Sequence, residues 1–341
     1  MPVVKRAKIA DVAQAVGVSR STVSVALSGQ KRVNPALKER IIKAARKLNY
    51  QPHPNAQALA RGRTKKIGVL VRHLYSQFTP LAVQAVEEAA ATRGYTISLG
   101  ITGEDEHKIH THLDNFSHGQ ADGLLILTNA VSFEEITSLA DRGYPVSLFG
   151  MNIPEREDLT LVSLDETTAL LQLLDYLYSL GHRQYGVLWE LRSGTPEEVE
   201  LVHTFATKHN LRMDESRQVD GIVSIDDAEV AAGELLDRHP EITALVCQAD
   251  TFAIGAINAA AKRNLRVPED LTVVGQDDFP IGRHYLPALT TIRFPFAEVA
   301  KGLVDGIVDW VEGKPRRRPV RVSTELILRQ SSGPARTQHA L

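Results

Sequence analysis

The segment from Gly17 to Gly29, "GVSRSTVSVALSG", combines side chains that could contact nucleic acid with the apolar residues of a short helix. Arginine donates hydrogen bonds to base edges, and serine and threonine hydroxyls bind base edges or phosphate oxygens. Such contacts require a support that fits the major groove of DNA, and an α-helix is narrow enough to enter it. The segment therefore predicts a groove-reading unit.

Two short helices must position these side chains. Apolar residues at i, i+3, i+4 and i+7 predict a first helix over residues 9–16, and Gly17 ends it. Ser19 is the predicted N-cap of a second helix that runs to about Leu27. The pair forms a helix-turn-helix, in which the second helix lies in the major groove.

A third helix completes the predicted head. It starts from the N-cap Asn34, has Pro35 at its first helical position and ends at about Leu48. The region is also strongly basic. Through Lys66 the chain has 15 Lys and Arg against Asp11 and Glu39, a net charge of +13, so a total of −2 leaves −15 on the remainder. A basic module joined to an acidic body is typical of nucleic-acid-binding proteins.

The sequences "KIADVAQAVGVSRSTVSVALSG" and "VNPALKERIIKAARKLNYQPHPNAQALARGRTKKIGVLV" resemble the head and hinge of the lac repressor (LacI/GalR) family of transcriptional regulators. The resemblance implies that Arg20 and Ser21 begin the recognition helix and that residues 54–62 form a hinge helix. It also implies that Leu59 inserts between base steps in the minor groove. The implied DNA-binding residues are Ser19, Arg20, Ser21, Thr22, Ser24, Val25, Asn34, Asn55, Leu59 and Ala60.

From Ile67 onwards, short apolar runs alternate with helical stretches. Segments such as "KIGVLV", "DGLLILT", "QYGVLWE", "ALVCQ" and "TVVGQ" predict strands, with helices such as those over residues 80–93 and 167–180 between them. This alternation predicts parallel sheets covered by helices, with a ligand beyond the carboxyl ends of the strands. The resemblance refines the prediction to a periplasmic-binding-protein-like α/β body of two doubly wound parallel-sheet subdomains with an effector between them.

The candidate effector contacts follow predicted strands or correspond to family positions. Asp277 matches a family carboxylate that accepts hydrogen bonds from a ligand hydroxyl or amine, and Phe78 or Trp189 could stack on an apolar ligand face or pack in the core. Arg72, His73 and Arg192 could pair with an anionic ligand or be solvated. The effector set is Tyr75, Ser76, Phe78, Thr79, Asn129, Trp189, Asp250, Gln276 and Asp277.

The expected organisation has four parts, and their bounds rest largely on the resemblance. They are a helix-turn-helix head over 1–52, a hinge helix and linker over 53–64, an effector-binding and dimerisation domain over 65–332, and a flexible tail over 333–341. Within the large domain, the N-subdomain is expected to take about 65–162 plus 293–328, and the C-subdomain about 163–292.

We predict a cytoplasmic, homodimeric repressor that binds double-stranded operator DNA and a small-molecule effector, a sugar or related metabolite. No enzyme activity, cofactor, metal or membrane partner is expected. The chain has no catalytic motif, His107, His110 and His112 look like surface residues, and the single Cys247 lacks companions for a zinc site. Two alternatives remain: a regulator of this type controlled by a protein co-regulator, and a solute-binding receptor.

Overall fold

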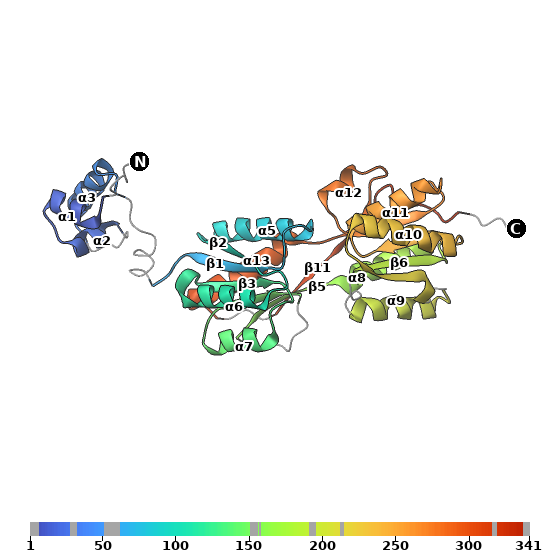
Figure 1. The fold of residues 1–341 in the computed structure, drawn as a ribbon, viewed down its shortest axis with the longest axis horizontal. Helices are drawn as coiled ribbons and strands as arrows, with labels where there is room; N and C mark the ends of the chain where they lie inside the picture. Colours follow the sequence, from blue (N-terminus) through green and yellow to red (C-terminus); the bar gives the residue numbers. More distant parts are fainter. Residues whose placement is uncertain are drawn as a thin grey trace. The chain divides into compact units, whose positions relative to one another are not determined.

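The computed structural model describes residues 7–27, 33–50, 62–150, 156, 158–190, 196–211, 215–315 and 319–336. These residues form a three-helix head and an α/β body with two six-stranded sheets (Figure 1). No helix in this part of the chain has both the length and the apolar character needed to cross a membrane.

The head consists of α1 (Ile9–Val16), α2 (Arg20–Leu27) and α3 (Pro35–Lys47). Gly17 ends α1 in the left-handed region, at a φ of 73°, and its amide donates to the Ala13 carbonyl. The Asn34 side chain caps α3 by accepting a hydrogen bond from the Ala36 amide at 2.9 Å. The predicted helices and both caps are confirmed. Side chains from all three helices share one core: Val12, Ala13, Val23, Ala26, Ile41 and Ala45.

The first sheet has the strand order β11-β5-β4-β3-β1-β2. Its strands are β1 (Lys66–Val71), β2 (Thr96–Ile101), β3 (Gly123–Leu127), β4 (Val146–Phe149), β5 (Thr160–Asp165) and β11 (Val320–Ser323). The registered pairs β1–β2, β1–β3, β4–β5 and β5–β11 are all parallel. Parallel pairing requires crossover connections, and helices supply those between β1 and β2, β2 and β3, and β3 and β4.

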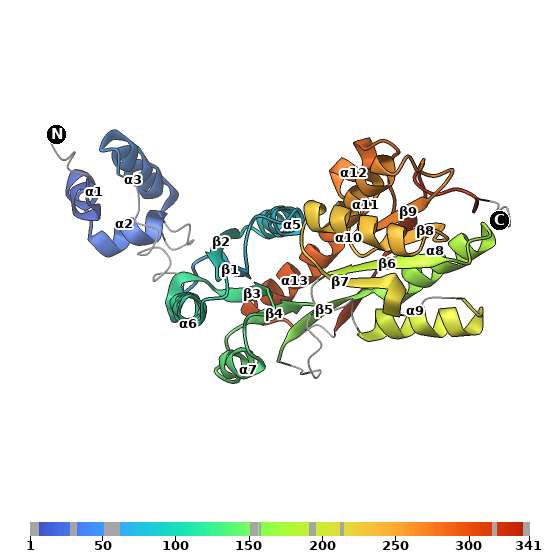
Figure 2. The ribbon, with the colours of Figure 1, turned by 45° about the vertical axis from the view of Figure 1, so that its right-hand side comes forward.

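The helices connected to this sheet are α5 (Phe78–Thr92), α6 (Glu106–Asn115), α7 (Phe133–Asp141) and α13 (Phe296–Val311). A short π-helix, η1 (Phe116–Gln120), follows α6. Figure 2 shows α6 and α7 side by side on one face of the sheet. Helix α13 packs tightly because it presents glycine to β5: a Cβ on Gly306 would lie 2.4 Å from the Thr160 side chain.

The second sheet has the strand order β12-β10-β9-β8-β6-β7. Its strands are β6 (Tyr185–Glu190), β7 (Gln218–Ile222), β8 (Ala244–Cys247), β9 (Thr272–Asp277), β10 (Thr290–Arg293) and β12 (Glu325–Ile327). Every registered pair is parallel except β10–β12, which is antiparallel.

Helices cover both faces of the second sheet. They are α8 (Glu166–Ser179), α9 (Pro196–Lys208), α10 (Ile225–Arg238) and α11 (Asp250–Lys262), with a 3-10 turn, η2 (Glu215–Arg217), before β7 and a short α12 (Pro280–His284) after β9. Successive β6 side chains point to opposite faces: Leu188 packs with α10 and α11, whereas Val187 and Trp189 pack with α8 and α9. The central strands β6, β8, β9 and β10 are therefore buried on both sides, as the near-continuous apolar sequences of the first three predict.

Cys247, the only cysteine in the chain, ends β8 and is 1% exposed. Burial raises the pKa of its thiol well above the usual range. The thiol therefore packs as a small apolar group.

Candidate DNA-binding and effector sites

The N-terminal end of α2 presents an exposed row of polar side chains. Ser19, Arg20 and Ser21 are exposed, and Val23, one turn further along, is fully buried in the head core. The amphipathic pattern of the helix thus turns its first residues outward. This is the arrangement that base or phosphate contacts require.

Three hydroxyl groups at this end bind one another. The Ser19 Oγ accepts from the Thr22 amide at 3.1 Å, which makes Ser19 the N-cap of α2 as predicted. The same oxygen lies 2.7 Å from the Ser21 Oγ and 2.8 Å from the Thr22 Oγ1. No such hydrogen bond involves the Arg20 guanidinium among the described residues, so its donors are available to an acceptor outside the chain.

The remaining predicted DNA contacts differ in position. Ser24 and Val25 are half-buried on α2, and Asn34 is exposed at the start of α3. Asn55, Leu59 and Ala60 lie outside the described residues. The DNA-binding assignments therefore remain predictions, and exposure favours Arg20 and Ser21 most strongly.

The segment that leads into β1 is anchored by one carboxylate. The Thr64 amide and hydroxyl donate to the Asp122 Oδ1 at 2.6 and 2.7 Å, and the Lys65 amide donates to Oδ2 at 3.0 Å. One residue earlier, the Arg63 Nη2 donates to the Val311 carbonyl at the end of α13 at 2.6 Å. No sequence motif marks this anchor, because Asp122 lies 57 and 58 residues from its partners.

The carboxyl end of β9 carries an unusual backbone turn. Asp277 has a φ of 108° and Asp278 a φ of 57°, both in the region that favours glycine. Such conformations cost about 1–3 kcal/mol each and persist where surrounding contacts hold them. Asp277, the predicted ligand contact, is half-buried at this turn.

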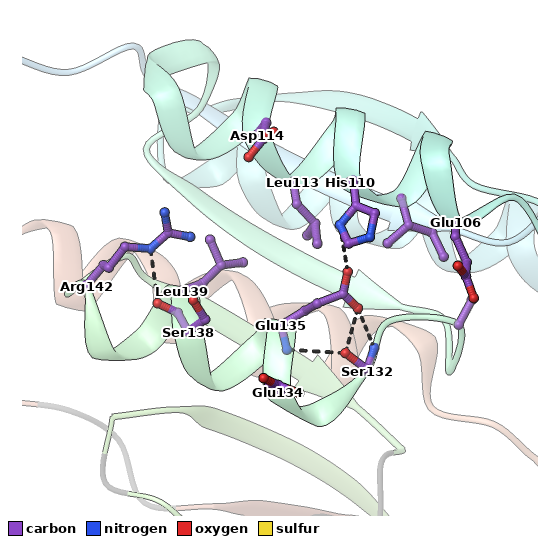
Figure 3. A pocket seen from close by; sticks show the side chains of 12 residues that line it. Glu106, His110, Leu113, Asp114, Ser132, Glu134, Glu135, Ser138, Leu139 and Arg142 are labelled. Carbon is purple, nitrogen blue, oxygen red and sulfur yellow. Dashed lines mark hydrogen bonds and ion pairs between the residues drawn. The ribbon is translucent and has the colours of Figure 1, made fainter.

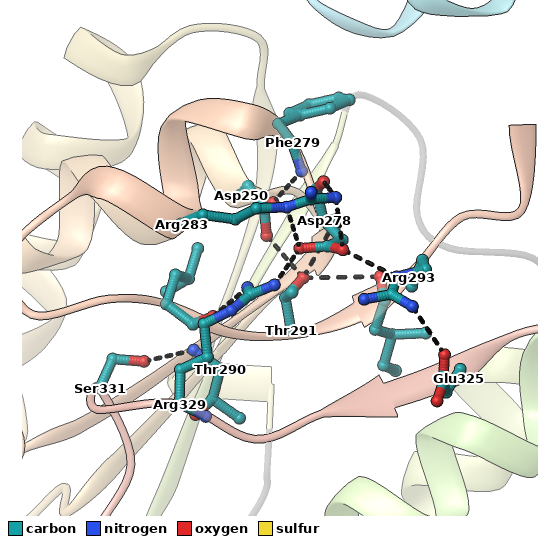
Figure 4. Close-up of polar contacts among 12 residues, drawn as sticks. Asp250, Asp278, Phe279, Arg283, Thr290, Thr291, Arg293, Glu325, Arg329 and Ser331 are labelled. Carbon is teal, nitrogen blue, oxygen red and sulfur yellow. Dashed lines mark hydrogen bonds and ion pairs between the residues drawn. The ribbon is translucent and has the colours of Figure 1, made fainter.

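Asp250 stabilises the turn through both of its carboxylate oxygens. Its Oδ2 accepts from the Phe279 amide at 2.6 Å, and its Oδ1 accepts from the Thr291 hydroxyl at 2.6 Å (Figure 4). Burial raises the pKa of Asp250 to about 7, although both hydrogen bonds act in the opposite direction. Because Asp250 is fully buried and both its oxygens are occupied, the structure favours a positioning role over direct ligand contact.

Asp278 is held by three arginines, namely Arg283, Arg293 and Arg329 (Figure 4). Its side chain is fully buried. Burial alone would raise the pKa of this carboxyl, but the three arginine hydrogen bonds outweigh burial and lower it. Asp278 therefore remains ionised and ties the turn to β10 and to the segment after β12.

An aromatic cluster surrounds Phe294, the residue after β10. The Phe294 ring lies 4.8 Å from Phe78, 5.4 Å from Phe149 and 4.4 Å from Phe296, measured between ring centroids. All four side chains are half-buried. Of these only Phe78 was predicted as a ligand contact, because Phe149, Phe294 and Phe296 belong to no binding motif and lie far from Phe78 in the sequence.

The other predicted effector residues are scattered. Tyr75 is 85% exposed and stacks on His73 with ring centroids 3.7 Å apart, and Trp189 is 4% exposed and donates to the Gln218 side chain. The Ser76 Oγ accepts from the Thr79 amide at the start of α5. The described geometry thus makes Trp189 a packing residue. Among the remaining positions, Asn129 is exposed and Gln276 is half-buried.

A cavity of about 560 Å³ lies between α6 and α7 (Figure 3). Across it, the His110 Nδ1 lies 3.1 Å from the Glu135 Oε1, and Glu106, Asp114 and Glu134 also line it. None of the predicted effector residues lines this cavity, and the His110–Glu135 pair spans it.

No metal site is evident within the described ranges: no group of three or more His, Cys, Asp or Glu is arranged to hold an ion. His107, His110 and His112 lie on α6, the polar helix that the sequence predicted.

Comparison with known proteins gives matches over nearly the whole chain. Residues 8–53 match the model for bacterial regulatory proteins of the lacI family, and residues 64–329 match that for periplasmic binding proteins and the sugar binding domain of the LacI family. The repressor CytR of Escherichia coli strain K12 is 28% identical over 96% of both chains. The repressor PurR of Haemophilus influenzae strain PittEE is 27% identical over 95% of this chain and 98% of its own.

Solved structures agree in fold. A lac repressor dimer bound to operator and the anti-inducer ONPF has a TM-score of 0.85 at 22% identity, and covers 96% of this chain and all of its own. The complex of the transcriptional regulator CelR with cellobiose has a TM-score of 0.69 at 25% identity, with the same coverage. With its helix-turn-helix head followed by a periplasmic-binding-protein-like body, the chain belongs to the lacI family of bacterial regulatory proteins.

Proposed function

We propose that the protein is a sequence-specific transcriptional repressor whose operator affinity is controlled by a small-molecule effector bound to its α/β body. The observation that carries the proposal is the exposed end of α2, where Arg20 and Ser21 face solvent on a helix-turn-helix. Ligand binding by the α/β body is supported by polar groups that converge near the carboxyl ends of β9 and β10. Ligands of parallel α/β sheets bind at such ends.

In the proposed mechanism a homodimer acts in the cytoplasm on a pseudo-palindromic operator, each head reading one half-site. Leu59 of each hinge segment enters the minor groove, and α5 contributes to the subunit interface. Effector binding changes operator affinity through the segment that Asp122 anchors to β3. A coupling of about 1–3 kcal/mol, roughly 5- to 150-fold in affinity, is usual for such regulation.

The effector proposed here uses Asp277 for a hydroxyl or amine, and the cluster of Phe78, Phe149, Phe294 and Phe296 for an apolar or planar face. Asp250 and Asp278 position Asp277 through the backbone turn. A sugar or related metabolite fits this chemistry.

The DNA-binding half of the proposal is tested by selecting operator sequences from random duplexes with the full-length protein. Affinity is then measured by fluorescence anisotropy at fixed salt. Arg20→Ala should weaken binding to the selected operator by about 1–3 kcal/mol, roughly 5- to 150-fold, and relax selectivity at one base pair. The control, Arg266→Ala, removes an exposed arginine that pairs with Asp270 on the body. Equal losses in both variants would contradict a base contact by Arg20.

The effector half is tested with the same operator in the presence of sugars, sugar phosphates, nucleosides and organic acids. A compound that changes operator affinity should lose its effect in Asp277→Ala, while operator binding without the compound stays unchanged. If no compound acts but a protein fraction does, control by a co-regulator replaces the small-molecule proposal.

A further inference from the structure

The three arginines around Asp278 carry more positive charge than the carboxylates they bind. Arg283, Arg293 and Arg329 contact Asp278, and Arg293 also pairs with Glu325 at 2.9 Å. Three guanidinium charges therefore face the Asp278 and Glu325 carboxylates in direct contact, and Asp277 precedes Asp278 in the same turn. Arginine stays ionised at all relevant pH values, so these positive charges are permanent.

The excess charge is directed outward. The Asp278 side chain is 0% exposed, whereas the side chains of Arg283 and Arg293 are 50% and 42% exposed. The negative charge is thus buried and two of the positive charges reach solvent. Arg329 is 16% exposed and also donates to the Leu289 carbonyl, so its role is internal.

Both exposed guanidinium groups are held in place by carboxylates, and each keeps N–H donors that bind no other described residue. Arg283 uses Nε and Nη2 on Asp278, and Arg293 uses Nε on Asp278 and Nη1 on Glu325. The Arg283 Nη1 and the Arg293 Nη2 make no such bond to another described residue. A guanidinium held in place by a buried carboxylate loses little side-chain entropy when it binds a further acceptor.

The location also suits a ligand. Arg293 ends β10, and Arg283 lies on α12, five residues after Asp278, which directly follows β9. These strands are adjacent and parallel, so their carboxyl ends share one edge of the sheet. Asp277 and Asp250 are the other carboxylates near the turn. Asp250 is buried beneath it, and Asp277 is assigned to a ligand hydroxyl or amine.

We infer that Arg283 and Arg293 form an anion-recognition site, so that the effector carries a phosphate or carboxylate group in addition to its hydroxyl or amine. This inference rests on the proposed effector function and narrows its chemistry. Phosphate and carboxylate oxygens match the paired N–H donors of guanidinium groups, whereas a neutral sugar leaves the two charges unmatched.

The test uses full-length protein and inorganic phosphate as the first probe. Thermal unfolding is followed at increasing phosphate, with ionic strength held constant by chloride. Phosphate should raise the Tm of the wild type, because a ligand that binds only the folded state stabilises it. The shift should disappear in Arg283→Gln and Arg293→Gln and persist in the control Arg266→Gln. No shift in the wild type, or an equal shift in all variants, would overturn the inference.

Matched pairs of compounds extend the test to organic ligands: ribose with ribose 5-phosphate, and glucose with glucose 6-phosphate, measured by calorimetry. The phosphorylated member should bind at least about tenfold more tightly, and each glutamine variant should lose about tenfold of that preference. If a glutamine variant fails to fold, Arg283→Lys and Arg293→Lys keep the charge but lose the planar fork, and a several-fold loss is expected.

Operator binding in the same samples separates the two proposals. A protein that binds operator but neither phosphate nor any phosphorylated compound remains a repressor and lacks the anion site. A protein that binds phosphate through Arg283 and Arg293, while its operator affinity responds to no phosphorylated or carboxylated compound, has the anion site. The effector proposal would then be wrong.

Discussion

At the level of single residues, the buried carboxylate of Asp250 links protonation to stability. Its pKa in the folded protein is about 7, above the ordinary value of about 3.9 expected in the unfolded chain. Between these values the folded state binds more protons than the unfolded state. Stability from this group is therefore fully present below about pH 4 and is lost as pH rises towards 7.

We expect Asp250→Asn to flatten the dependence of stability on pH. In the wild type this group lowers the free energy of unfolding by up to about 1.4 kcal/mol per pH unit as pH rises from 5 to 7. Asparagine does not titrate in this range and can still accept a hydrogen bond from the Phe279 amide. Urea unfolding at several pH values checks this, and a variant with the slope of the wild type would show that Asp250 is ionised throughout.

The same residue shows what sequence can reveal about a site. Asp250 and Asp277 were identified because each follows an apolar strand, and their position at the sheet edge is as predicted. The three arginines that bind Asp278 were not identified from the sequence, because they lie 5, 15 and 51 residues from Asp278. Nothing in a single sequence marks such distant pairs.

At the level of secondary-structure elements, the contact between Asp122 and residues 64–65 joins the chain that leaves the head to the start of β3. Asp122→Ala leaves two backbone amides and a hydroxyl without their acceptor. Charge-assisted hydrogen bonds contribute about 1.5–3 kcal/mol, so the free energy of unfolding should fall by about that amount and operator affinity should also fall.

Urea unfolding and operator anisotropy measure these two effects of Asp122→Ala. Asp114→Ala, an exposed aspartate on α6, is the matched control and should change neither. Reduced stability with unchanged operator affinity would mean that the Asp122 anchor stabilises the body but does not affect DNA binding by the head.

Two glycines on helix α13 differ in how closely they approach β5, so alanine substitutions at each test the packing of the helix on the strand. A Cβ on Gly306 would lie 2.4 Å from the Thr160 side chain on β5, whereas a Cβ on Gly302, one turn earlier, would lie 3.1 Å from a Val162 methyl. Alanine favours helix by about 1 kcal/mol over glycine, and overpacking costs about 1–3 kcal/mol.

Gly302→Ala should therefore be nearly neutral and Gly306→Ala clearly destabilising, measured by urea unfolding. Similar values for both variants would show that α13 shifts away from β5 as easily at one position as at the other.

Strand predictions from sequence succeeded where apolar residues are continuous and failed where strands are short or polar. β1, β6 and β9 were predicted almost to the residue because both their faces are buried. β7, β11 and β12 were missed because their burial is partial and their apolar residues few, and β10 was missed because its sequence, TTIR, holds one apolar residue although it is largely buried. Strand β12 pairs antiparallel with β10, more than thirty residues earlier, so its pairing depends on the tertiary fold.

At the level of the whole molecule, the charge of the chain is divided between a basic head region and an acidic body. Phosphate contacts by such a head give affinity that falls steeply with salt. A dimer that binds two half-sites has a much higher affinity than a single head, because its second head binds intramolecularly.

We therefore expect a duplex with a single half-site to bind at least about 100-fold more weakly than the full operator, with a salt slope reduced by about half. Light scattering should give about twice the chain mass of 37.5 kDa. The control duplex keeps both half-sites but separates them by about five more base pairs, half a helical turn, and should bind as the single half-site does. Equal affinity for all three duplexes would exclude a two-headed complex.

The isolation of Cys247 gives the protein a built-in chemical reporter. Alkylating reagents attack the thiolate of an accessible cysteine, and this thiol is buried at the end of a central strand with a raised pKa. Labelling should therefore require the second sheet to open, and the labelled fraction measured by mass spectrometry would follow that opening alone. Because no second cysteine competes, a cysteine introduced on α2 or α6 would carry a spectroscopic probe at one defined position.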